Sequence, residues 1–594
     1  MYGLLATVAG LLSWLSFWMD GPSCRCRPQE PCWPDQQQWA ALNTSLDGVL
    51  LHVRPVASVC HEPTFDQRSC GELLQLTAHS AWRAAQPGAL QHWVWETGTD
   101  SNQTCLVGSP KEIPCHQGQI PLYSAAVRSP RHVQRAVKFA KEHKLRVVIK
   151  NTGHDGSGRS SSPESFQIHT HLLKDITYHA DFLVSGAIAP SGPAVTIGAG
   201  VMHGELYAHG SRQGFMVVGG ECPTVGAAGG FLQAGGVSSF FSHAHGLAVD
   251  NVLELQVVTA DGEVLTANNY QNQDLFWALR GGGGGTFGVL TQATLRAYPD
   301  NPVVVTTVAV SAPRIHHLSW TVGLARILAT LQSLNAEGVP GQFILGPSPT
   351  SSLKASLAVY FLNVTDASAM ERRVRQHFAS LGEEGLSYTL SSESLTRVSS
   401  ALRMAPDIYP EDYGILQGSM LVSDKLFNSG DGPRQMAEAF ARLPMGTDDI
   451  LFTSNLGGRV TTNAGISNTS MHPAWRSSAQ LITFVRAVEP SIEGKIAAVE
   501  GLTNIQMPIL YALEPLSRVS YLNLGAPNER DFQHVYWGDN YDRLARIKRI
   551  VDKDDLFITR LGVGSERWDE DGMCRKSRSV VSRAWELLSD IMLS

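Results

Sequence analysis

Charge is scarce in this sequence, and no long run of basic residues occurs in it. Charged residues make up 17% of the chain, and 47 lysines and arginines against 54 aspartates and glutamates leave a net charge of −7. A protein that binds nucleic acid needs a clustered positive surface to neutralise phosphates, so this class of function is excluded. The chain also has no internal repeat and no low-complexity tract, which excludes a solenoid or a long biased arm.

No apolar run reaches the length of a membrane span, which is about 20 residues. The most apolar stretch, Leu4 to Met19, has sixteen residues and ends at Asp20-Gly21-Pro22. This length is typical of the core of a signal peptide, so we expect residues 1–20 to direct secretion. No lysine or arginine precedes the run and no clean small-x-small cleavage site follows it. An uncleaved anchor or a buried helix is therefore the alternative.

Zinc-type cysteine spacing is also missing, although nine cysteines are present. No paired C-x-x-C set occurs, so we predict no metal site. With Cys222 set aside for a chemical role, an even number remains, which predicts four disulfides in an oxidising compartment: Cys24, Cys26, Cys32, Cys60, Cys70, Cys105, Cys115 and Cys574. Four Asn-x-Ser/Thr sequons agree with that compartment and are predicted glycosylation sites: Asn43, Asn102, Asn363 and Asn468.

A length of 594 residues is too great for one hydrophobic core and predicts two or three units. Residues 21–118 are rich in Cys, Pro, Gln and Trp, and we interpret them as a disulfide-bonded leader over a larger body. Ser129-Pro130 predicts a helix start, with a β-branched strand at Leu145 to Ile149 after the helix. Strands and glycine-rich turns then alternate up to residue 299, including a hairpin predicted at Asp261-Gly262.

A different pattern follows in the second half of the chain. Residues 300–509 combine β runs such as Val303 to Val310 with longer helices, which is typical of a separate α+β domain. Residues 510–570 carry one amphipathic helix with Leu544, Ile547 and Val551 on its apolar face. Residues 571–594 predict a terminal helix. The predicted fold class is therefore α+β.

Two glycine-rich loops match none of the common nucleotide fingerprints. No G-x-x-x-x-G-K-[ST] run exists, which excludes a P-loop, and no G-x-G-x-x-G stands where a Rossmann fold needs it. The first loop, residues 151–158, follows a predicted strand and contains His154, and the second, residues 219–236, contains Cys222. Glycine lets backbone N–H groups approach a phosphate closely. Taken alone, either loop is more simply interpreted as a tight turn.

Taken in order, these loops and three further motifs resemble one known family. The motifs are Gly153-His154, Gly220 to Gly226, His245 to Val252, Asp274 to Arg280 and Trp537 to Leu544. The chain is similar to the berberine bridge enzyme-like oxidases of the vanillyl-alcohol oxidase and p-cresol methylhydroxylase (PCMH) superfamily, in particular to secreted fungal members. One departure is Ala234-Gly235-Gly236, where many relatives have three glycines. We expect it to change a single turn.

The resemblance implies the domain organisation and the cofactor. A PCMH-type FAD-binding domain of two subdomains would occupy residues 119–299, a substrate-binding domain would occupy 300–509, and a berberine-bridge segment at 510–570 would return to the FAD domain. FAD would be attached twice, through His154 to its 8α-methyl carbon and through Cys222 to ring carbon 6. The expected cofactor-binding residues are Asn151, Thr152, Gly153, His154, Asp155, Cys222, Pro223, Thr224, Gly226, Gly230, Gly246, Val252, Asn540 and Tyr541.

The catalytic base in this family is usually a tyrosine or a glutamate near the flavin N5 atom. Ser520-Tyr521-Leu522-Asn523 matches the segment that faces the flavin, so Tyr521 is the predicted base. The pKa of a tyrosine is about 10, so its neighbours would have to lower this pKa before it could accept a proton at neutral pH. Tyr413, Glu411 and Arg459 are the alternatives.

The predicted function is that of a secreted FAD-dependent oxidase. Hydride would move from a small organic substrate, such as an alcohol, an amine or an intermediate of secondary metabolism, to the flavin. Dioxygen would then be reduced to hydrogen peroxide. One alternative is a carbohydrate oxidase on the same fold, and the other is a flavin-bound pericyclase or binding protein without redox turnover. The expected partners are a small molecule and dioxygen, with no nucleic acid and no stable membrane span.

Overall fold

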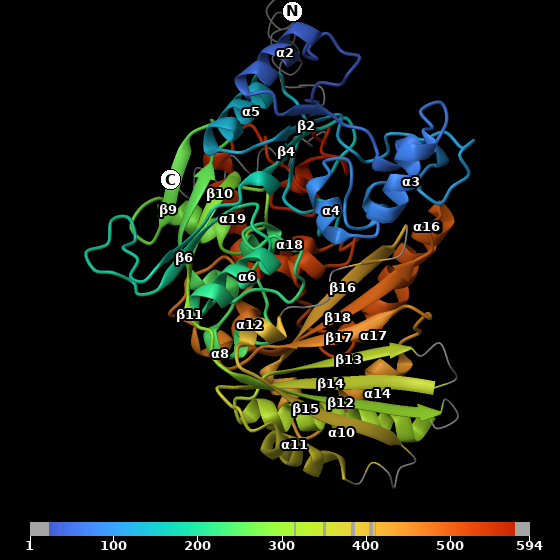
Figure 1. The fold of residues 1–594 in the computed structure, drawn as a ribbon, viewed down its shortest axis with the longest axis vertical. Helices are drawn as coiled ribbons and strands as arrows, with labels where there is room; N and C mark the ends of the chain where they lie inside the picture. The colour runs from blue at the N-terminus through green and yellow to red at the C-terminus, as the bar shows by residue number, and fades with distance from the viewer. Residues whose placement is uncertain are drawn as a thin grey trace, which may run out of the picture.

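The computed structural model describes residues 23–313, 317–347, 352–379, 381, 386–402, 408–409 and 412–576 (Figure 1). The expected signal segment, 1–20, and residues 577–594 of the expected terminal helix lie outside these ranges. Two small sheets occupy the upper part of Figure 1, and a seven-stranded sheet lies below them. Helices accompany all three, so the predicted α+β class is confirmed.

The first sheet joins the leader to the chain that follows it. Its order is β1-β2-β4-β3, with β1 antiparallel to β2 and the other neighbours parallel. Helix α5 (Pro130–Glu142) begins as predicted, because the Ser129 hydroxyl accepts the His132 N–H and proline occupies the first turn. The strands are β1 (Leu50–His52), β2 (Tyr123–Ala126), β3 (Val147–Lys150) and β4 (Phe166–His169). The leader thus supplies an edge strand, which the sequence did not predict.

The second sheet is antiparallel and has the order β5-β6-β10-β8-β9. Strands β8 and β9 form the predicted hairpin, in which Gly262 has a φ of 74° that favours glycine. The strands are β5 (Ile176–His179), β6 (Ala194–Gly198), β8 (Val252–Val258), β9 (Val264–Asn268) and β10 (Val289–Arg296). Between and beside them lie α6 (His203–Gln213), α7 (Gly230–Gln233), α8 (Ser242–His245), α9 (Gln273–Leu279) and the paired strands β7 (Phe215–Met216) and β11 (Tyr298–Pro299).

The third sheet has seven antiparallel strands in the order β15-β12-β14-β13-β17-β18-β16. They are β12 (Val303–Pro313), β13 (Gly341–Pro347), β14 (Ser352–Leu362), β15 (Ser387–Leu395), β16 (Gly414–Ser423), β17 (Ile450–Asn455) and β18 (Ser478–Val488). The longer helices are α10 (His317–Ala336), α11 (Ala367–Arg375), α14 (Gly432–Arg442), α16 (Ile492–Gly501) and α17 (Met507–Tyr511), and the short ones are α12 (Val398–Ala401), α13 (Asp424–Phe427) and α15 (Arg459–Thr462).

The seven-stranded sheet uses both of its faces. Successive side chains of a strand point to opposite faces. Phe343 and Leu357 pack in one core with residues of α10, α14 and α17. Tyr360 and Leu481, on the opposite face, belong to the core of the second sheet. The sheet therefore has a helix-covered face and a face turned toward the smaller sheets.

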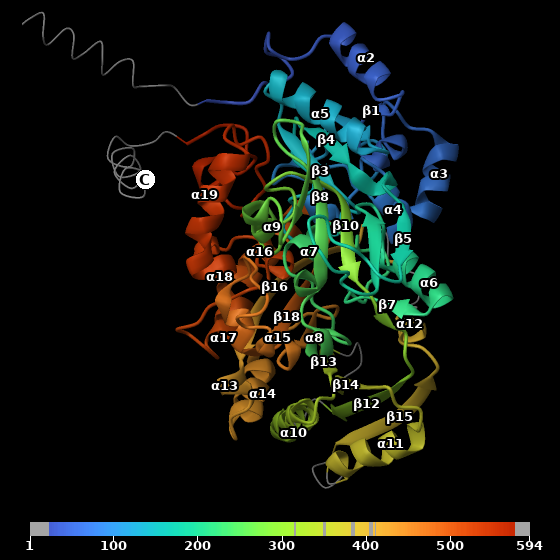
Figure 2. The same cartoon turned by 90° about the vertical axis from the view of Figure 1, so that its left-hand side faces the viewer.

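The C-terminal segment returns to the second sheet, where helix α19 (Tyr541–Val551) packs on α9 (Figure 2). The ammonium group of Lys548 is fully buried and donates to the carbonyl oxygens of Thr286 and Phe557, each at 2.7 Å. The Trp537 indole, at the end of α18 (Phe532–Trp537), donates to the Gly281 carbonyl oxygen at 2.9 Å. This segment therefore holds the glycine run 281–285 at both of its ends.

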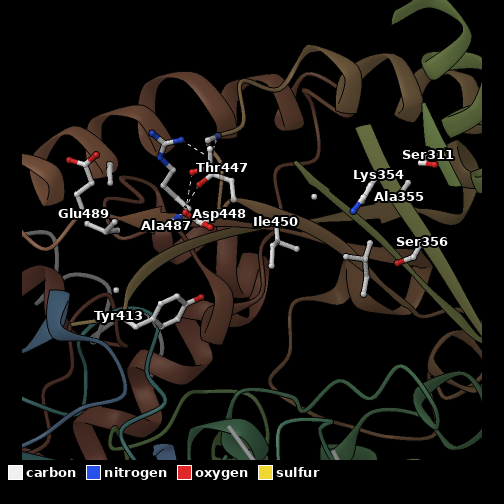
Figure 3. A pocket seen from close by; sticks show the side chains of 18 of the residues that line it. Ser311, Lys354, Ala355, Ser356, Tyr413, Thr447, Asp448, Ile450, Ala487 and Glu489 are labelled. Atoms are coloured by element: carbon white, nitrogen blue, oxygen red, sulfur yellow. Dashed lines mark hydrogen bonds and ion pairs between the residues drawn. The ribbon is translucent and has the colours of Figure 1, made fainter. Parts of the chain in front are cut away.

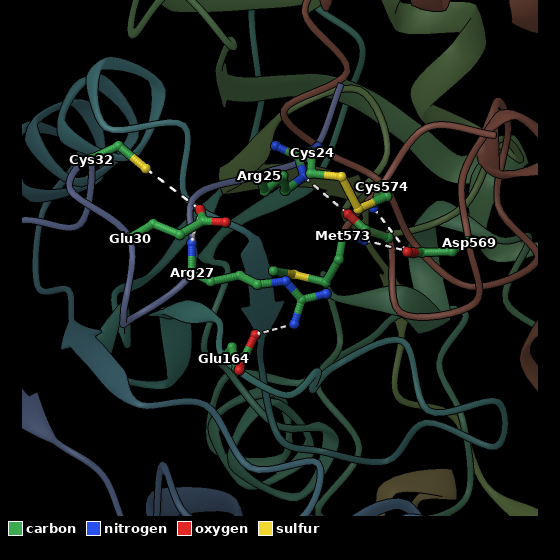
Figure 4. The surroundings of a disulfide bond; sticks show 10 residues. Cys24, Arg25, Arg27, Glu30, Cys32, Glu164, Asp569, Met573 and Cys574 are labelled. Carbon is green, nitrogen blue, oxygen red and sulfur yellow. Dashed lines mark hydrogen bonds and ion pairs between the residues drawn. A yellow bond between two sulfur atoms is a disulfide. The ribbon is translucent and has the colours of Figure 1, made fainter. Parts of the chain in front are cut away.

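Four disulfides pair the eight predicted cysteines, and Cys222 lies outside them. The pairs are Cys24–Cys574, Cys26–Cys32, Cys60–Cys70 and Cys105–Cys115. The first joins residues 550 positions apart, whereas the others are local (Figure 4). Beside it, Arg25 donates to the Gly572 carbonyl oxygen at 3.0 Å and lies 4.5 Å from the centre of the Trp568 ring. The first and last parts of the described chain are thus joined covalently.

The molecular surface bears on two further expectations. Among the described residues, no helix is both long and apolar enough to cross a membrane. Three sequon asparagines are exposed, namely Asn102, Asn363 and Asn468. Asn43 is half-buried, and its side-chain oxygen accepts the Leu50 N–H at 3.1 Å. Glycosylation at these positions stays a prediction.

Opening the Cys24–Cys574 disulfide should destabilise the protein more than opening a local one. In Cys24→Ser/Cys574→Ser, a cross-link spanning 550 positions no longer restricts the unfolded chain, and we expect the free energy of unfolding to fall by about 2–5 kcal/mol. The matched control Cys60→Ser/Cys70→Ser opens a loop spanning 10 positions and should lose less. Urea denaturation measures both losses. A larger loss in the control would contradict this ranking.

Candidate active site

His154 and Cys222 come from distant loops and meet at one point. His154 lies in the loop after β3, where Gly153 has a φ of 81° that suits glycine alone. Cys222 lies between β7 and α7. The Cys222 Sγ is 3.9 Å from the His154 Nε2, and the Thr224 Oγ1 is 2.6 Å from that same nitrogen. The structure thus brings together the two side chains that the sequence predicts to hold a cofactor.

A glycine-lined cavity lies beside this pair. Its lining comes from the loop 151–160, the loop 226–236 and the glycine run 281–288. A Cβ atom at Gly226 would collide with the Asn151 side chain, and one at Gly284 would come within 3.1 Å of the Gly230 Cα. Only glycine therefore allows these segments to approach one another. Of the predicted residues, Asn151, Asp155 and Gly230 line the cavity.

Two acceptors in the cavity wall are buried without a hydrogen-bond partner in the described structure: the Asn151 Oδ1 and the Gln233 Oε1. Their orientation is fixed, because the Asn151 Nδ2 donates to the Ala199 carbonyl oxygen and the Gln233 Nε2 donates to those of Ala228 and Gly229. Buried polar atoms are normally satisfied. The wall therefore suits a ligand that presents hydroxyl or N–H groups, as the ribityl chain and flavin ring of FAD do.

Arg159 is a cavity residue that the sequence analysis missed. Its Nε lies 3.2 Å from the Asp155 Oδ1, and its Nη2 donates to the Asn523 Oδ1 at 3.1 Å. The Asn523 Nδ2 in turn donates to the Gly230 carbonyl oxygen at 2.9 Å. This chain of contacts ties the wall of the cavity to the C-terminal segment. No motif marked Arg159, since its role depends on partners far away in the sequence.

Tyr521, the predicted base, is buried at the end of this chain of contacts. Its hydroxyl oxygen accepts the Asn523 Nδ2–H at 2.7 Å and the Gly236 N–H at 3.3 Å. Burial raises the pKa of Tyr521 to about 12, and the two donors offset only part of this rise. The neighbours thus lower the pKa of Tyr521, as a base would require, but by less than burial raises it. Tyr521 stays protonated at neutral pH.

Two further histidines lie close to His154. Burial lowers the pKa of His92 to about 3, and the neighbouring His154 and Arg83 lower it further. Burial likewise lowers the pKa of His203 to about 3, again assisted by His154. Both rings are therefore neutral at physiological pH. The neighbourhood of His154 thus carries less positive charge than its three histidines would suggest.

The remaining predicted cofactor residues are dispersed. Thr152 is buried, and its carbonyl oxygen accepts the Gln91 Nε2–H at 2.8 Å. Pro223 packs near Gly204. Four others are absent from the described lining of the glycine-lined cavity: Gly246, Val252, Asn540 and Tyr541. Asn540 donates to the Met471 carbonyl oxygen, and Tyr541 donates to Glu566, each at 2.6 Å. Cofactor contact by these four stays a prediction.

A groove of about 1340 Å³ runs along the face of the seven-stranded sheet that is turned toward the smaller sheets (Figure 3). Ile344, Ser356 and Ile450 line it, and they alternate with core residues of the helix-covered face. Tyr413 lies at one end of the groove, with its ring centre 5.6 Å from that of His92. Since His92 neighbours His154, the groove reaches the surroundings of the predicted attachment site.

The three alternative candidates for the base, Tyr413, Glu411 and Arg459, differ in where they lie relative to the groove. Tyr413 lines the groove, and burial raises its pKa, as does Asp448. Arg459, at the start of α15, lies near His245 and lowers the pKa of that ring. Glu411 lies outside the described residues. Tyr413 is thus the one of the three that the described structure places in the groove.

Known proteins match the chain along most of its length. Residues 121–268 match the family model of the FAD binding domain, and residues 520–564 match that of berberine and berberine-like proteins. An FAD-linked oxidoreductase, easE of Epichloe festucae var. lolii, is 55% identical over 97% of this chain and 96% of its own length.

Solved structures agree with these matches. The VAO-type flavoprotein MtVAO615 from Myceliophthora thermophila C1 is 30% identical, with a TM-score of 0.83 over 93% of this chain and 100% of that chain. The berberine bridge enzyme of Eschscholzia californica is 16% identical, with a TM-score of 0.65 over 89% of this chain and 98% of that chain. At this identity, the similarity to the Eschscholzia californica enzyme shows a shared fold alone.

Removing Arg159 should leave a buried carboxylate unpaired. Asp155 and Arg159 keep only 9% and 7% of their side-chain surface, so Arg159→Met should lower the free energy of unfolding by about 3–5 kcal/mol. The matched control is Arg68→Met, which breaks an exposed pair on helix α3 (Gln67–Leu76) and should cost less than about 1 kcal/mol. Thermal and urea unfolding measure both losses. Equal losses would refute the structural role of Arg159.

Proposed function

The chain belongs to the berberine bridge enzyme-like FAD-linked oxidoreductases, and from this premise we propose that it is an oxidase that uses doubly attached FAD. The enzyme would take a hydride from an alcohol, an amine or a related small molecule. Family membership confirms the predicted class of enzyme and its FAD-binding domain. The substrate, the acceptor dioxygen and the two covalent links belong to the proposal.

The observation that carries the proposal is the meeting of His154 and Cys222. Attachment at the 8α-methyl carbon and at ring carbon 6 engages two positions on the same side of one aromatic ring, with a single ring carbon between them. It therefore requires two nucleophilic side chains close together. The separation of 3.9 Å between the Cys222 Sγ and the His154 Nε2 satisfies this requirement. The local disulfides leave Cys222 out of their pairing, which supports a chemical role for its thiol.

The glycine-lined cavity, of about 60 Å³, suits one polar part of the cofactor. Asn151 and Gln233 offer buried acceptors to hydroxyl and N–H groups, and Arg159 adds N–H donors to the wall while its charge is paired with Asp155. When bound, FAD supplies a hydride acceptor that dioxygen can reoxidise. The protein supplies the position of the cofactor and a site from which water is excluded. The groove on the seven-stranded sheet, which reaches His92 beside His154, would hold the substrate.

Secretion is part of the same proposal. The four disulfides suit an oxidising compartment, where such bonds persist. The apolar run at Leu4 to Met19 and the three exposed sequon asparagines support the secretory pathway. Mass analysis of protein from its native host would detect glycans at Asn102, Asn363 and Asn468. Unmodified asparagines with free thiols at the eight paired cysteines would contradict this location.

Acid denaturation tests the two covalent links. The unmodified protein should stay yellow in the pellet, and its mass should exceed that of the polypeptide by one FAD. His154→Ala and Cys222→Ala should each keep one link, and only the double variant should release free FAD to the supernatant. Ser101→Ala, far from both loops in the sequence, serves as a control for handling. Release of FAD from the unmodified protein would refute double attachment.

Peroxide release tests the oxidase activity itself. Purified holoenzyme should produce hydrogen peroxide and bleach its flavin under anaerobic conditions with some members of a panel of aromatic and aliphatic alcohols, amines and polyketide alcohols. A panel of sugars tests the carbohydrate oxidase alternative. A flavin that stays oxidised with every compound would support the redox-silent alternative instead.

A further inference from the structure

Glu221 lies directly before Cys222, and the oxidase proposal gives it no role. Its Oε1 accepts the Ser239 N–H at 2.6 Å, and the residue as a whole is half-buried. Three residues before Ser239, the Gly236 N–H donates to the Tyr521 hydroxyl. One short segment, residues 236–239, thus donates hydrogen bonds both to Tyr521, the predicted base, and to the Glu221 carboxylate. The Tyr521 hydroxyl and the Glu221 carboxyl group therefore border the same part of the site.

This carboxylate also faces the substrate-binding sheet. The Ser239 hydroxyl donates to the hydroxyl of Ser454, on β17, at 3.3 Å. The next residue, Phe240, stacks on Tyr360 of β14 with ring centres 3.8 Å apart. Ser454 and Tyr360 lie on the open face of β17 and β14, four positions along the strand from the groove residues Ile450 and Ser356. Glu221 therefore stands where the Cys222 loop meets the face that would bind the substrate.

The titratable groups that face Glu221 come from two elements and from its own loop. They are Tyr207 on α6, Tyr360 on β14 and Cys222. Burial raises the pKa of both tyrosines, and the negative charge of Glu221 raises each further, so both phenols stay neutral at physiological pH. Burial raises the pKa of Glu221 to about 7, and the hydrogen bonds from Ser239 offset part of that rise.

A general base works best when its pKa is near the working pH. The carboxyl group of Glu221 meets this condition, because it exists in both forms near neutrality. Tyr521 does not meet it, since burial raises its pKa to about 12. Its oxygen already accepts two hydrogen bonds, which suits a group that positions its neighbours. Glu221 and Tyr521 thus differ both in pKa and in the hydrogen bonds that their oxygens accept.

We infer that Glu221 is the catalytic base, which removes the proton from the substrate's O–H or N–H group as hydride leaves the adjacent carbon. This inference rests on the oxidase proposal. The substrate loses one hydride and one proton and becomes a carbonyl compound or an imine. The hydride goes to the flavin and the proton to the Glu221 carboxylate. When dioxygen takes the two electrons, it also takes two hydrogens, one from the reduced flavin and one from protonated Glu221, and leaves as hydrogen peroxide.

The first test uses the flavin as its own reporter and needs no substrate. In the native holoenzyme, the visible absorbance of the flavin should shift through one ionisation near pH 7, as a neighbouring carboxyl group loses its proton. Glu221→Gln should lose this transition while it keeps its full load of flavin by mass. Tyr521→Phe and the exposed control Glu263→Gln should both retain it. A transition that survives in Glu221→Gln would overturn the assignment.

The second test measures anaerobic bleaching with the compound from the peroxide panel that reduces the native flavin fastest. The native rate should rise with pH through the same ionisation, since only the carboxylate accepts a proton. Glu221→Gln should reduce its flavin about 100-fold more slowly and lose the pH dependence. Glu221→Asp should keep the pH dependence at a lower rate, and Glu263→Gln should behave as the native enzyme.

The outcomes separate this inference from the proposal on which it rests. If the native enzyme is bleached and Glu221→Gln is bleached equally fast with the same pH profile, Glu221 is not the base. If Tyr521→Phe alone removes the pH dependence, the base is Tyr521. If no compound bleaches the native enzyme, the oxidase proposal fails, while the absorbance titration still reports whether the Glu221 carboxyl group ionises near the flavin.

Discussion

The close approach of three backbone segments around one cavity is the constraint on which the rest of the structure depends. The segments are the loops 151–160 and 226–236 and the glycine run 281–288. A Cβ at Gly226 would overlap the Asn151 side chain, and one at Gly284 would press on Gly230. The C-terminal segment then holds the glycine run in place through Lys548 and Trp537. The cavity thus depends on the C-terminal segment as well as on the loops that line it.

The same arrangement explains why the domains cannot be understood singly. The seven-stranded sheet packs its helices on one face and offers the other to the loops that carry Glu221 and Cys222. The leader adds a strand to the first sheet, and the Cys24–Cys574 disulfide ties it to the C-terminal segment. A substrate on the open face of the sheet would therefore lie next to the cofactor. The segments that would hold the cofactor are kept in position by the Cys24–Cys574 disulfide and by the C-terminal segment.

Burial, more than any ion pair, determines the protonation states in this site. It keeps His92 and His203 neutral, holds Tyr521 in its phenol form, and leaves the carboxyl group of Glu221 close to half-ionised near neutrality. A charged group costs free energy wherever protein replaces water, so the least charged form prevails unless a partner compensates. The site therefore combines two neutral histidines, a protonated tyrosine and the Arg159–Asp155 ion pair with the carboxyl group of Glu221, whose pKa lies near neutrality.

Much of the fold was accessible from the sequence, because its signals are local. The cap at Ser129-Pro130, the hairpin at Asp261-Gly262 and the apolar face of α19 each depend on residues within a few positions of one another. The two loops with His154 and Cys222 were recognisable by their order and their glycines. The even number of cysteines other than Cys222 predicted disulfides, although not that Cys24 pairs with Cys574.

The sequence by itself determined which chemical groups are present, in which order, and on which kinds of elements, since composition, caps and turns depend on neighbours along the chain. Only the tertiary structure decided that His154 and Cys222 meet, that Arg159 joins Asp155 to Asn523, and that Glu221 lies near Tyr360 on the seven-stranded sheet. It also decided that burial raises the pKa of Tyr521 by more than its neighbours lower it. The distance between two side chains and the burial of each one depend on residues far apart in the chain. No local sequence pattern encodes them.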